Sequence, residues 1–153
     1  MMKHATQYTE DDDIKRLLLS GDVRAYPASL SKRAFSHLAA VYPLNSMATT
    51  TILDWPKINH LELKWCEFDD DEVFSWTRGT LLKSHSFGLL VYSEFSDCLF
   101  GKLSFVMKNL DILTSCAPGP RLVFAVDVLA DDVIVFTHGI LETNGLDRLF
   151  API

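Results

Sequence analysis

The sequence has 153 residues, of which 48% are hydrophobic and 22% charged, and its formal net charge is −6 with a pI near 5.2. Such a length and composition predict a single globular domain over residues 1–153 rather than a disordered chain. The negative charge, without a basic stripe, disfavours binding to nucleic acid. An acidic surface is better suited to a basic protein partner.

The cysteines and the N-terminus indicate in which cellular compartment the protein is expected. Cys66, Cys98 and Cys116 are odd in number and form no CxxC pair, which is typical of a reduced chain. The N-terminus leads into acids without the apolar core of a signal peptide, and no apolar run approaches the roughly 18 residues that span a membrane. The sequence therefore predicts a cytoplasmic protein with no membrane segment.

The first third of the chain predicts two helices. The first begins at Thr9, whose side chain can cap the free amides beside the acids that follow it, and stops at Gly21. The second begins at Ser29 or Ser31 and ends at Tyr42, before a proline. Its apolar residues recur at helical spacing, so one side of it should face the core.

The middle of the chain alternates strands and helices. Residues 61–65 alternate apolar and polar side chains and predict a half-buried strand. A helix should open in the acidic run after Phe68 and continue to Leu81, and residues 87–92 should form an interior strand. The longest helix is expected to start at Ser96. Its core-facing stripe would consist of Leu99, Leu103, Val106, Leu110 and Leu113.

The most apolar stretch, Leu122–Phe136, predicts a β-hairpin. Two runs rich in β-branched and aromatic residues are separated by the three residues Ala130–Asp132, which suit a tight loop. The first run is apolar on both faces, so it should lie centrally in a sheet. In the expected register Asp127 lies opposite Val135. A short helical turn over 146–150 is expected to end the chain.

These elements predict an α+β fold, or a small α/β sandwich. We expect a mixed, mostly antiparallel sheet of about four to five strands, with a C-terminal hairpin and a cover of about four helices.

No sequence motif points to catalysis or to a cofactor. The chain has no GxGxxG, no GxxxxGK[ST], no GxSxG and no HExxH. We therefore expect no metal, no cofactor and no enzyme activity. The alternative is an active site without a motif, built for example on Cys98 as nucleophile with His85 or His138 as base.

Asp127 is unusual because it lies within the most apolar predicted strand. An unpaired carboxylate buried there would be strongly destabilising. Either a cation such as Arg121, Arg148 or a partner's basic residue meets it, or this face of the strand opens to a pocket or an interface.

The other candidate contact is the segment from Phe68 to Trp76. It concentrates acids at one helix end beside two aromatic residues, a combination that suits a protein interface. The alternative is a helix cap with solvated acids. The predicted partner-binding residues are Phe68, Asp69, Asp70, Asp71, Glu72, Trp76 and Asp127.

The sequence favours a small acidic protein that acts by binding. Our leading hypothesis is an inhibitor, such as a bacterial immunity protein or antitoxin, that occludes a basic toxin, possibly a nuclease. The alternatives are a structural or adaptor subunit of a homo-oligomer and the enzyme described above. The sequence does not predict the oligomeric state.

Overall fold

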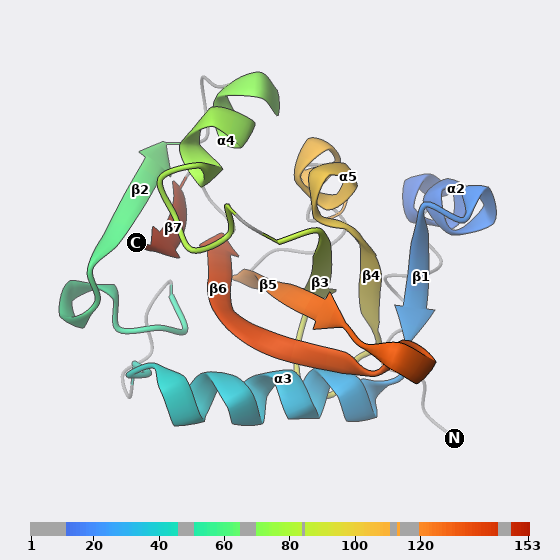
Figure 1. Cartoon of the computed structure of the whole chain (residues 1–153), viewed down its shortest axis with the longest axis horizontal. Helices are drawn as coiled ribbons and strands as arrows, with labels where there is room; N and C mark the ends of the chain where they lie inside the picture. Colours follow the sequence, from blue (N-terminus) through green and yellow to red (C-terminus); the bar gives the residue numbers. More distant parts are fainter. Residues whose placement is uncertain are drawn as a thin grey trace.

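The computed structural model describes residues 12–45, 51–64, 70–83, 85–110, 113, 120–143 and 148–153. They contain one seven-stranded sheet of order β1-β4-β3-β5-β6-β7-β2, in which every neighbouring pair is antiparallel (Figure 1). The strands are β1 (Val23–Tyr26), β2 (His60–Lys64), β3 (Phe87–Val91), β4 (Cys98–Lys102), β5 (Arg121–Val128), β6 (Ile134–Thr143) and β7 (Arg148–Pro152). The predicted α+β class is confirmed, although the sheet has more strands than expected.

Helices cover both faces of this sheet. The α-helices of the described residues are α2 (Asp12–Ser20), α3 (Ala28–Val41), α4 (Asp70–Thr77) and α5 (Leu103–Lys108). Figure 1 shows α3 along one face, with α2, α4 and α5 on the other. Each face has its own apolar cluster: Leu30, Ala34 and Leu38 of α3 belong to one, and residues of α2, α4 and α5 to the other.

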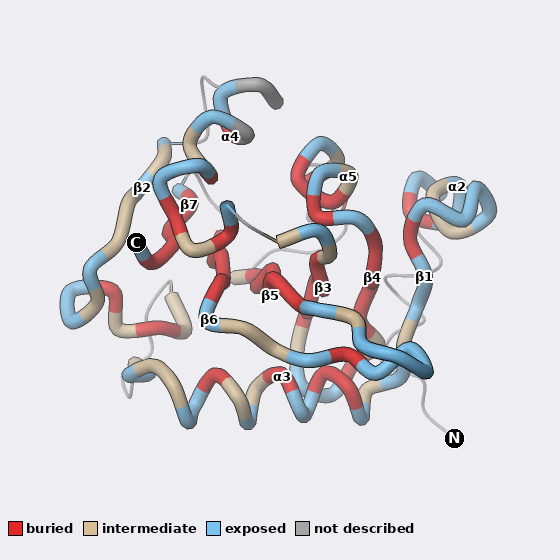
Figure 2. Tube along the Cα trace, viewed as in Figure 1, coloured by how far each residue is buried: buried red, intermediate tan, exposed pale blue. Residues whose placement is uncertain are grey.

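Strand β5 lies at the centre of this arrangement, as its sequence predicts. Leu122 and Phe124 belong to the cluster under α3, whereas Val123 and Ala125 belong to the opposite cluster. All four are fully buried, and Figure 2 shows the buried inner part of β5. An interior strand apolar on both faces is stabilised by this double cover.

The predicted hairpin is confirmed together with its register. Strands β5 and β6 are joined through the 3-10 turn η3 (Ala130–Asp132), and Asp127 lies opposite Val135. The pairing shifts between Phe124 and Val126, which marks an irregularity in the ladder. Near it, a Cβ on Gly139 would lie 2.6 Å from the Leu81 carbonyl oxygen, so only glycine fits this close backbone approach.

The long helix predicted from Ser96 is wrong. Residues Cys98–Lys102 form strand β4, and α5 begins only at Leu103. The error has a physical reason: Leu99 on the strand and Val106 on the helix face the same apolar cluster, so their spacing imitates one continuous helical stripe. Pairing decides the outcome, because β4 lies between β1 and β3.

The chain end also differs from the sequence-based expectation. The helical turn predicted over 146–150 is wrong where the chain is described, because Arg148–Pro152 is strand β7. This strand lies between β6 and β2 and so extends the sheet beyond the predicted hairpin. Strand β1 was not predicted either; it has only four residues and pairs along its whole length with β4.

The other predicted elements are close to their observed positions. Helix α2 ends directly before Gly21, and α3 ends at Val41, one residue before the predicted Tyr42. The predicted strand at 61–65 corresponds to β2. Helix α4 stops at Thr77 rather than at Leu81.

Candidate functional site

Asp127 lies at the exposed part of β5. Its side chain is 56% exposed, and one carboxylate oxygen is 3.4 Å from Nδ1 of His85. Asp127 is therefore not a buried carboxylate, and this part of β5 is open. Of the two arginines considered, Arg148 contacts Glu62, and Arg121 donates to the Pro120 carbonyl. Asp127 is thus available at the surface.

Around Asp127, the outer part of the hairpin exposes apolar and acidic side chains together. We name this surface the hairpin end and define it as Asp127, Leu129, Asp131, Asp132, Val133 and Val135. Leu129, Val133 and Val135 are 57%, 49% and 38% exposed. The three aspartates are exposed as well. In Figure 2 the hairpin end is the mostly blue turn between β5 and β6, next to the start of α3.

The backbone at the hairpin end adopts a specific turn. Asp131 and Asp132 have φ angles of 62° and 58°, in the left-handed region that residues other than glycine and asparagine or aspartate seldom enter. The Leu129 amide donates to the Val133 carbonyl at 2.8 Å and closes this turn. The turn therefore directs two adjacent carboxylates outward between exposed apolar neighbours.

Helix α3 holds the base of the hairpin. Arg33 donates to the Ile134 carbonyl at 3.4 Å, and a ring nitrogen of His37 lies 2.8 Å from the Thr137 carbonyl oxygen. The His37 ring also stacks on Phe136, and Tyr42 donates to the His138 carbonyl. Beside Val133, a hollow of about 300 Å³ separates the hairpin end from the start of α3. The hairpin end is thus a supported surface with an adjoining hollow.

The second predicted contact segment is only partly described. Phe68 and Asp69 lie outside the described residues, as do the side chains of Asp70 and Asp71. Asp70 begins α4, which agrees with its predicted place at the start of a helix. Glu72 is exposed, whereas Trp76 packs partly buried against the apolar cluster of this face. The role of this segment in partner binding stays a prediction.

Cys98 lies in the core rather than at an accessible surface. It is fully buried, and its Sγ lies 3.8 Å from the Tyr26 carbonyl oxygen. Burial raises the pKa of the Cys98 thiol to about 11, so the thiol is protonated at neutral pH. The side chain packs in the apolar cluster under α3 as a small hydrophobic residue.

One buried carboxylate escaped the sequence analysis. Glu142 on β6 is fully buried and accepts hydrogen bonds from the amides of Ile52 and Leu53, at 2.5 and 3.1 Å, and from Nε1 of Trp55 at 2.9 Å. Burial raises the pKa of Glu142 to about 7 against the opposing effect of these three donors. Glu142 thereby fixes the segment before η1 (Trp55–Lys57) to the sheet. Its signal in the sequence was an acid directly after the apolar pair Ile140 and Leu141.

The described residues also bear on metal binding and on membrane segments. They contain no cluster of three or more histidine, cysteine or acidic side chains that could hold a metal ion. None of their helices combines the length and the hydrophobicity needed to cross a membrane. Comparisons with known protein families, with curated proteins and with solved structures returned no match to this chain.

Proposed function

We propose that this protein works by binding a basic protein partner and that the hairpin end is part of the contact surface. The observation that carries the proposal is the joint exposure of three apolar and three acidic side chains on one supported hairpin. Exposed apolar groups supply the area that is removed from water in a complex, and the carboxylates select a partner of opposite charge.

The charge of the whole chain supports the same partner chemistry. A net charge of −6 attracts a basic protein over a longer range, while the aspartates at the hairpin end act at close range. Asp131 and Asp132 form no ion pair with any residue that the structure describes. Their charges are therefore available to lysines or arginines of another protein.

Within this class, we propose an inhibitor that covers the working surface of a basic toxin, such as a bacterial immunity protein or antitoxin. Carboxylates on such an inhibitor can occupy positions that phosphates take in a nuclease. Self-association through the same apolar residues is the alternative, and it corresponds to a subunit of a homo-oligomer.

Site-specific photocrosslinking in cells that contain the natural partner tests the proposal. A photoreactive phenylalanine analogue replaces Leu129 in one variant and Leu19 in the control, where the native side chain is 89% exposed on α2. We expect a basic protein to be captured from position 129 and not from position 19. Capture of a second copy of this chain supports the homo-oligomer, and equal capture from both positions contradicts a contact at the hairpin end.

A charge and polarity variant then measures the contribution of the surface. The triple variant Leu129→Ser, Asp131→Asn, Asp132→Asn should weaken binding to the captured partner by at least about 2 kcal/mol and reduce its dependence on salt. The matched control is Leu19→Ser, Asp12→Asn, Asp13→Asn on α2, which removes the same groups elsewhere. Asparagine tolerates the left-handed turn, so the hairpin should keep its shape.

A further inference from the structure

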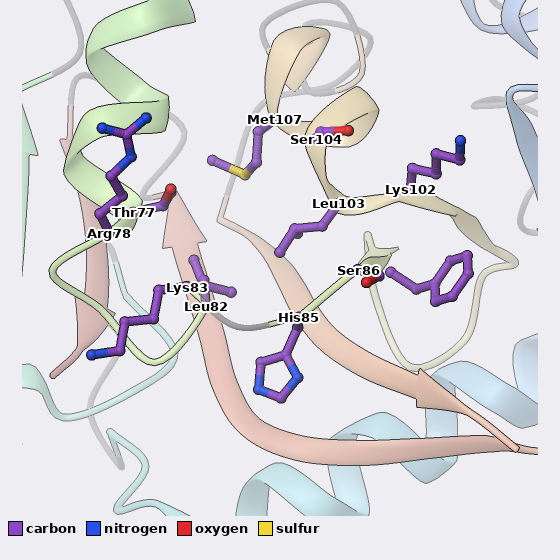
Figure 3. Close-up of a pocket in the computed structure, with 11 residues that line it drawn as sticks. Thr77, Arg78, Leu82, Lys83, His85, Ser86, Lys102, Leu103, Ser104 and Met107 are labelled. Atoms are coloured by element: carbon purple, nitrogen blue, oxygen red, sulfur yellow. The ribbon is translucent and has the colours of Figure 1, made fainter.

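A pocket of about 520 Å³ lies on the face of the sheet covered by α4 and α5. It is lined by the chain that follows α4, by the start of β3 and by the junction of β4 and α5 (Figure 3). Its volume falls in the range of pockets that hold small organic ligands, roughly 300–1,000 Å³. The hairpin-end residues do not line this pocket, so it is a separate candidate site.

The charge of this pocket is opposite to that of the whole protein. Arg78, Lys83, His85 and Lys102 line it, and no aspartate or glutamate occurs among its described lining residues. In Figure 3, Arg78 and Lys83 lie on one side of the pocket and Lys102 on the other. Such a grouping in a chain of net charge −6 creates a local positive field.

Three of these four side chains have no acidic partner among the described residues. Within the part of the chain that the structure describes, Arg78, Lys83 and Lys102 form no ion pair. All three are exposed, so their charged ends can adjust to a ligand. His85 is the exception, because it contacts Asp127 at the edge of the hairpin end. The pocket therefore has three available cationic side chains around its mouth.

The interior of the pocket is apolar. Leu82, Leu103 and Met107 are almost fully buried and lie between the cations in Figure 3. Phe87 adds an aromatic ring at the side of Lys102, where a second hollow of about 420 Å³ shares both residues. Hydroxyl groups of Thr77, Ser86 and Ser104 complete the lining and can donate to an oxyanion.

We propose that this pocket binds a small organic anion, whose carboxylate or phosphate group is attracted by the cations around the mouth, Arg78 and Lys83 on one side and Lys102 on the other. The apolar body of the ligand lies over Leu82, Leu103 and Met107. A purely inorganic anion gains nothing from these apolar residues, and a neutral apolar molecule gains nothing from the cations. The combination of both groups in one molecule is what the lining selects.

A matched set of aromatic probes tests this combination. The anions are 1-naphthyl phosphate and 1-naphthoate, and the controls are neutral 1-naphthol and inorganic phosphate. The chain has four methionines, and Met107 lines the pocket, so its 13C-labelled methyl group reports binding there by NMR. We expect at least one anion to shift the Met107 signal and to bind about tenfold or more tightly than either control. Comparison of the two anions identifies the preferred oxyanion.

Two outcomes overturn the proposal. One is that neither aromatic anion shifts the Met107 signal at concentrations up to about 10 mM. The other is that 1-naphthol binds as tightly as both anions, because the cations then have no role.

Charge variants localise the oxyanion group. Lys83→Gln with Lys102→Gln should weaken binding of the preferred probe by about tenfold or more. The control, Lys32→Gln with Lys64→Gln, removes two exposed lysines on α3 and β2 and should change the affinity less than about twofold. An equal loss in both variants indicates long-range attraction and contradicts a site at the pocket mouth. The triple variant of the hairpin end should leave probe affinity unchanged, which separates this test from that of the proposed function.

Discussion

The two ends of the β5–β6 hairpin have similar hydrophobicity and opposite environments. At the inner end, Leu122 and Phe124 are fully buried, as is Ile140 on the partner strand. At the outer end, Leu129 and Val133 are largely exposed although they are equally apolar. The difference comes from cover, because the inner end lies between the apolar clusters of both faces. Hydrophobicity alone therefore does not locate the core, and the uncovered apolar residues are candidates for binding.

The two carboxylates on this hairpin follow the same division. Glu142 at the inner end is enclosed and satisfied by three donors, whereas Asp127 at the outer end is exposed beside one histidine. One hairpin thus carries both a carboxylate that holds the structure together and a carboxylate that is open to solvent.

Removal of the inner carboxylate should have the largest effect. Glu142→Ala leaves the amides of Ile52 and Leu53 and the indole of Trp55 without their acceptor, so we expect the free energy of unfolding to fall by about 3 kcal/mol. Urea denaturation measures this change. The control Glu94→Ala, at an exposed position, should change stability by less than about 0.5 kcal/mol. A neutral Glu142→Ala would show that the segment before η1 is held by other contacts.

The ionisation of Glu142 should make stability depend on pH. Its pKa is near 7 in the folded protein and near 4.5 for an ordinary glutamate, so between these values the folded protein binds more protons than the unfolded chain. The free energy of unfolding should therefore fall as the pH rises through this window, by about 2–3 kcal/mol.

The variant Glu142→Gln isolates this contribution. Because glutamine does not titrate, the difference in stability between the native protein and the variant should change between pH 4.5 and 7. Denaturation curves measured at several pH values provide the comparison. Parallel pH profiles for the two proteins would contradict a raised pKa at Glu142.

Substitution of Gly139, near the shift in the β5–β6 pairing, should have an intermediate effect on stability. The Cβ of Gly139→Ala would lie 2.6 Å from the Leu81 carbonyl oxygen and 3.0 Å from the Ala125 side chain. Both segments must move apart, so we expect a loss of about 1–2 kcal/mol in thermal or urea unfolding. Gly21→Ala is a poor comparison because Gly21 has a positive φ. The better control is Ala39→Gly, an exposed helix position where the loss should stay near 0.5–1 kcal/mol.

The outer carboxylate should matter least for stability. Asp127→Ala removes only an exposed contact with His85, so the free energy of unfolding should change by less than about 0.5 kcal/mol. A loss of several kcal/mol would require Asp127 to be buried in solution and would remove it from the proposed contact surface. The same variant should weaken partner binding if the hairpin end is the contact.

The sequence predicted the hairpin because its information is local. The loop residues and the apolar runs on either side lie within fifteen positions, so the turn, the pairing and the register of Asp127 with Val135 all follow from one stretch. Strands β4 and β7 were missed because their own apolar spacing also suits a helix. Each has one neighbouring strand close in the chain and one far away, and the distant pairing with β1 or β2 leaves no local signal.

The candidate site was predictable only in part. Asp127 was singled out as an acid in an apolar strand. It is exposed because no other element covers the outer end of the hairpin, and no local sequence pattern encodes that. Glu142 carried the same signal, but it lies outside the stretch Leu122–Phe136 from which the hairpin was predicted. Of the pocket cations, Arg78 and Lys83 lie on the segment that follows α4 and Lys102 lies at the end of β4, so the two groups come together only through the fold.

The strand order has a consequence for the folding of the chain. Both edges of the sheet are closed by distant segments: Tyr26 on β1 meets Cys98 across 72 positions, and Glu62 on β2 meets Arg148 across 86. The central pairs, β3 with β4 and β5 with β6, are hairpins with much shorter loops. Because loop closure opposes distant pairing, we expect a nucleus in the two central hairpins and a late, slow step in which the edges close. Until that step, the N–H and C=O groups of β4 and β7 that later pair with β1 and β2 are unpaired and can bind strands of other molecules.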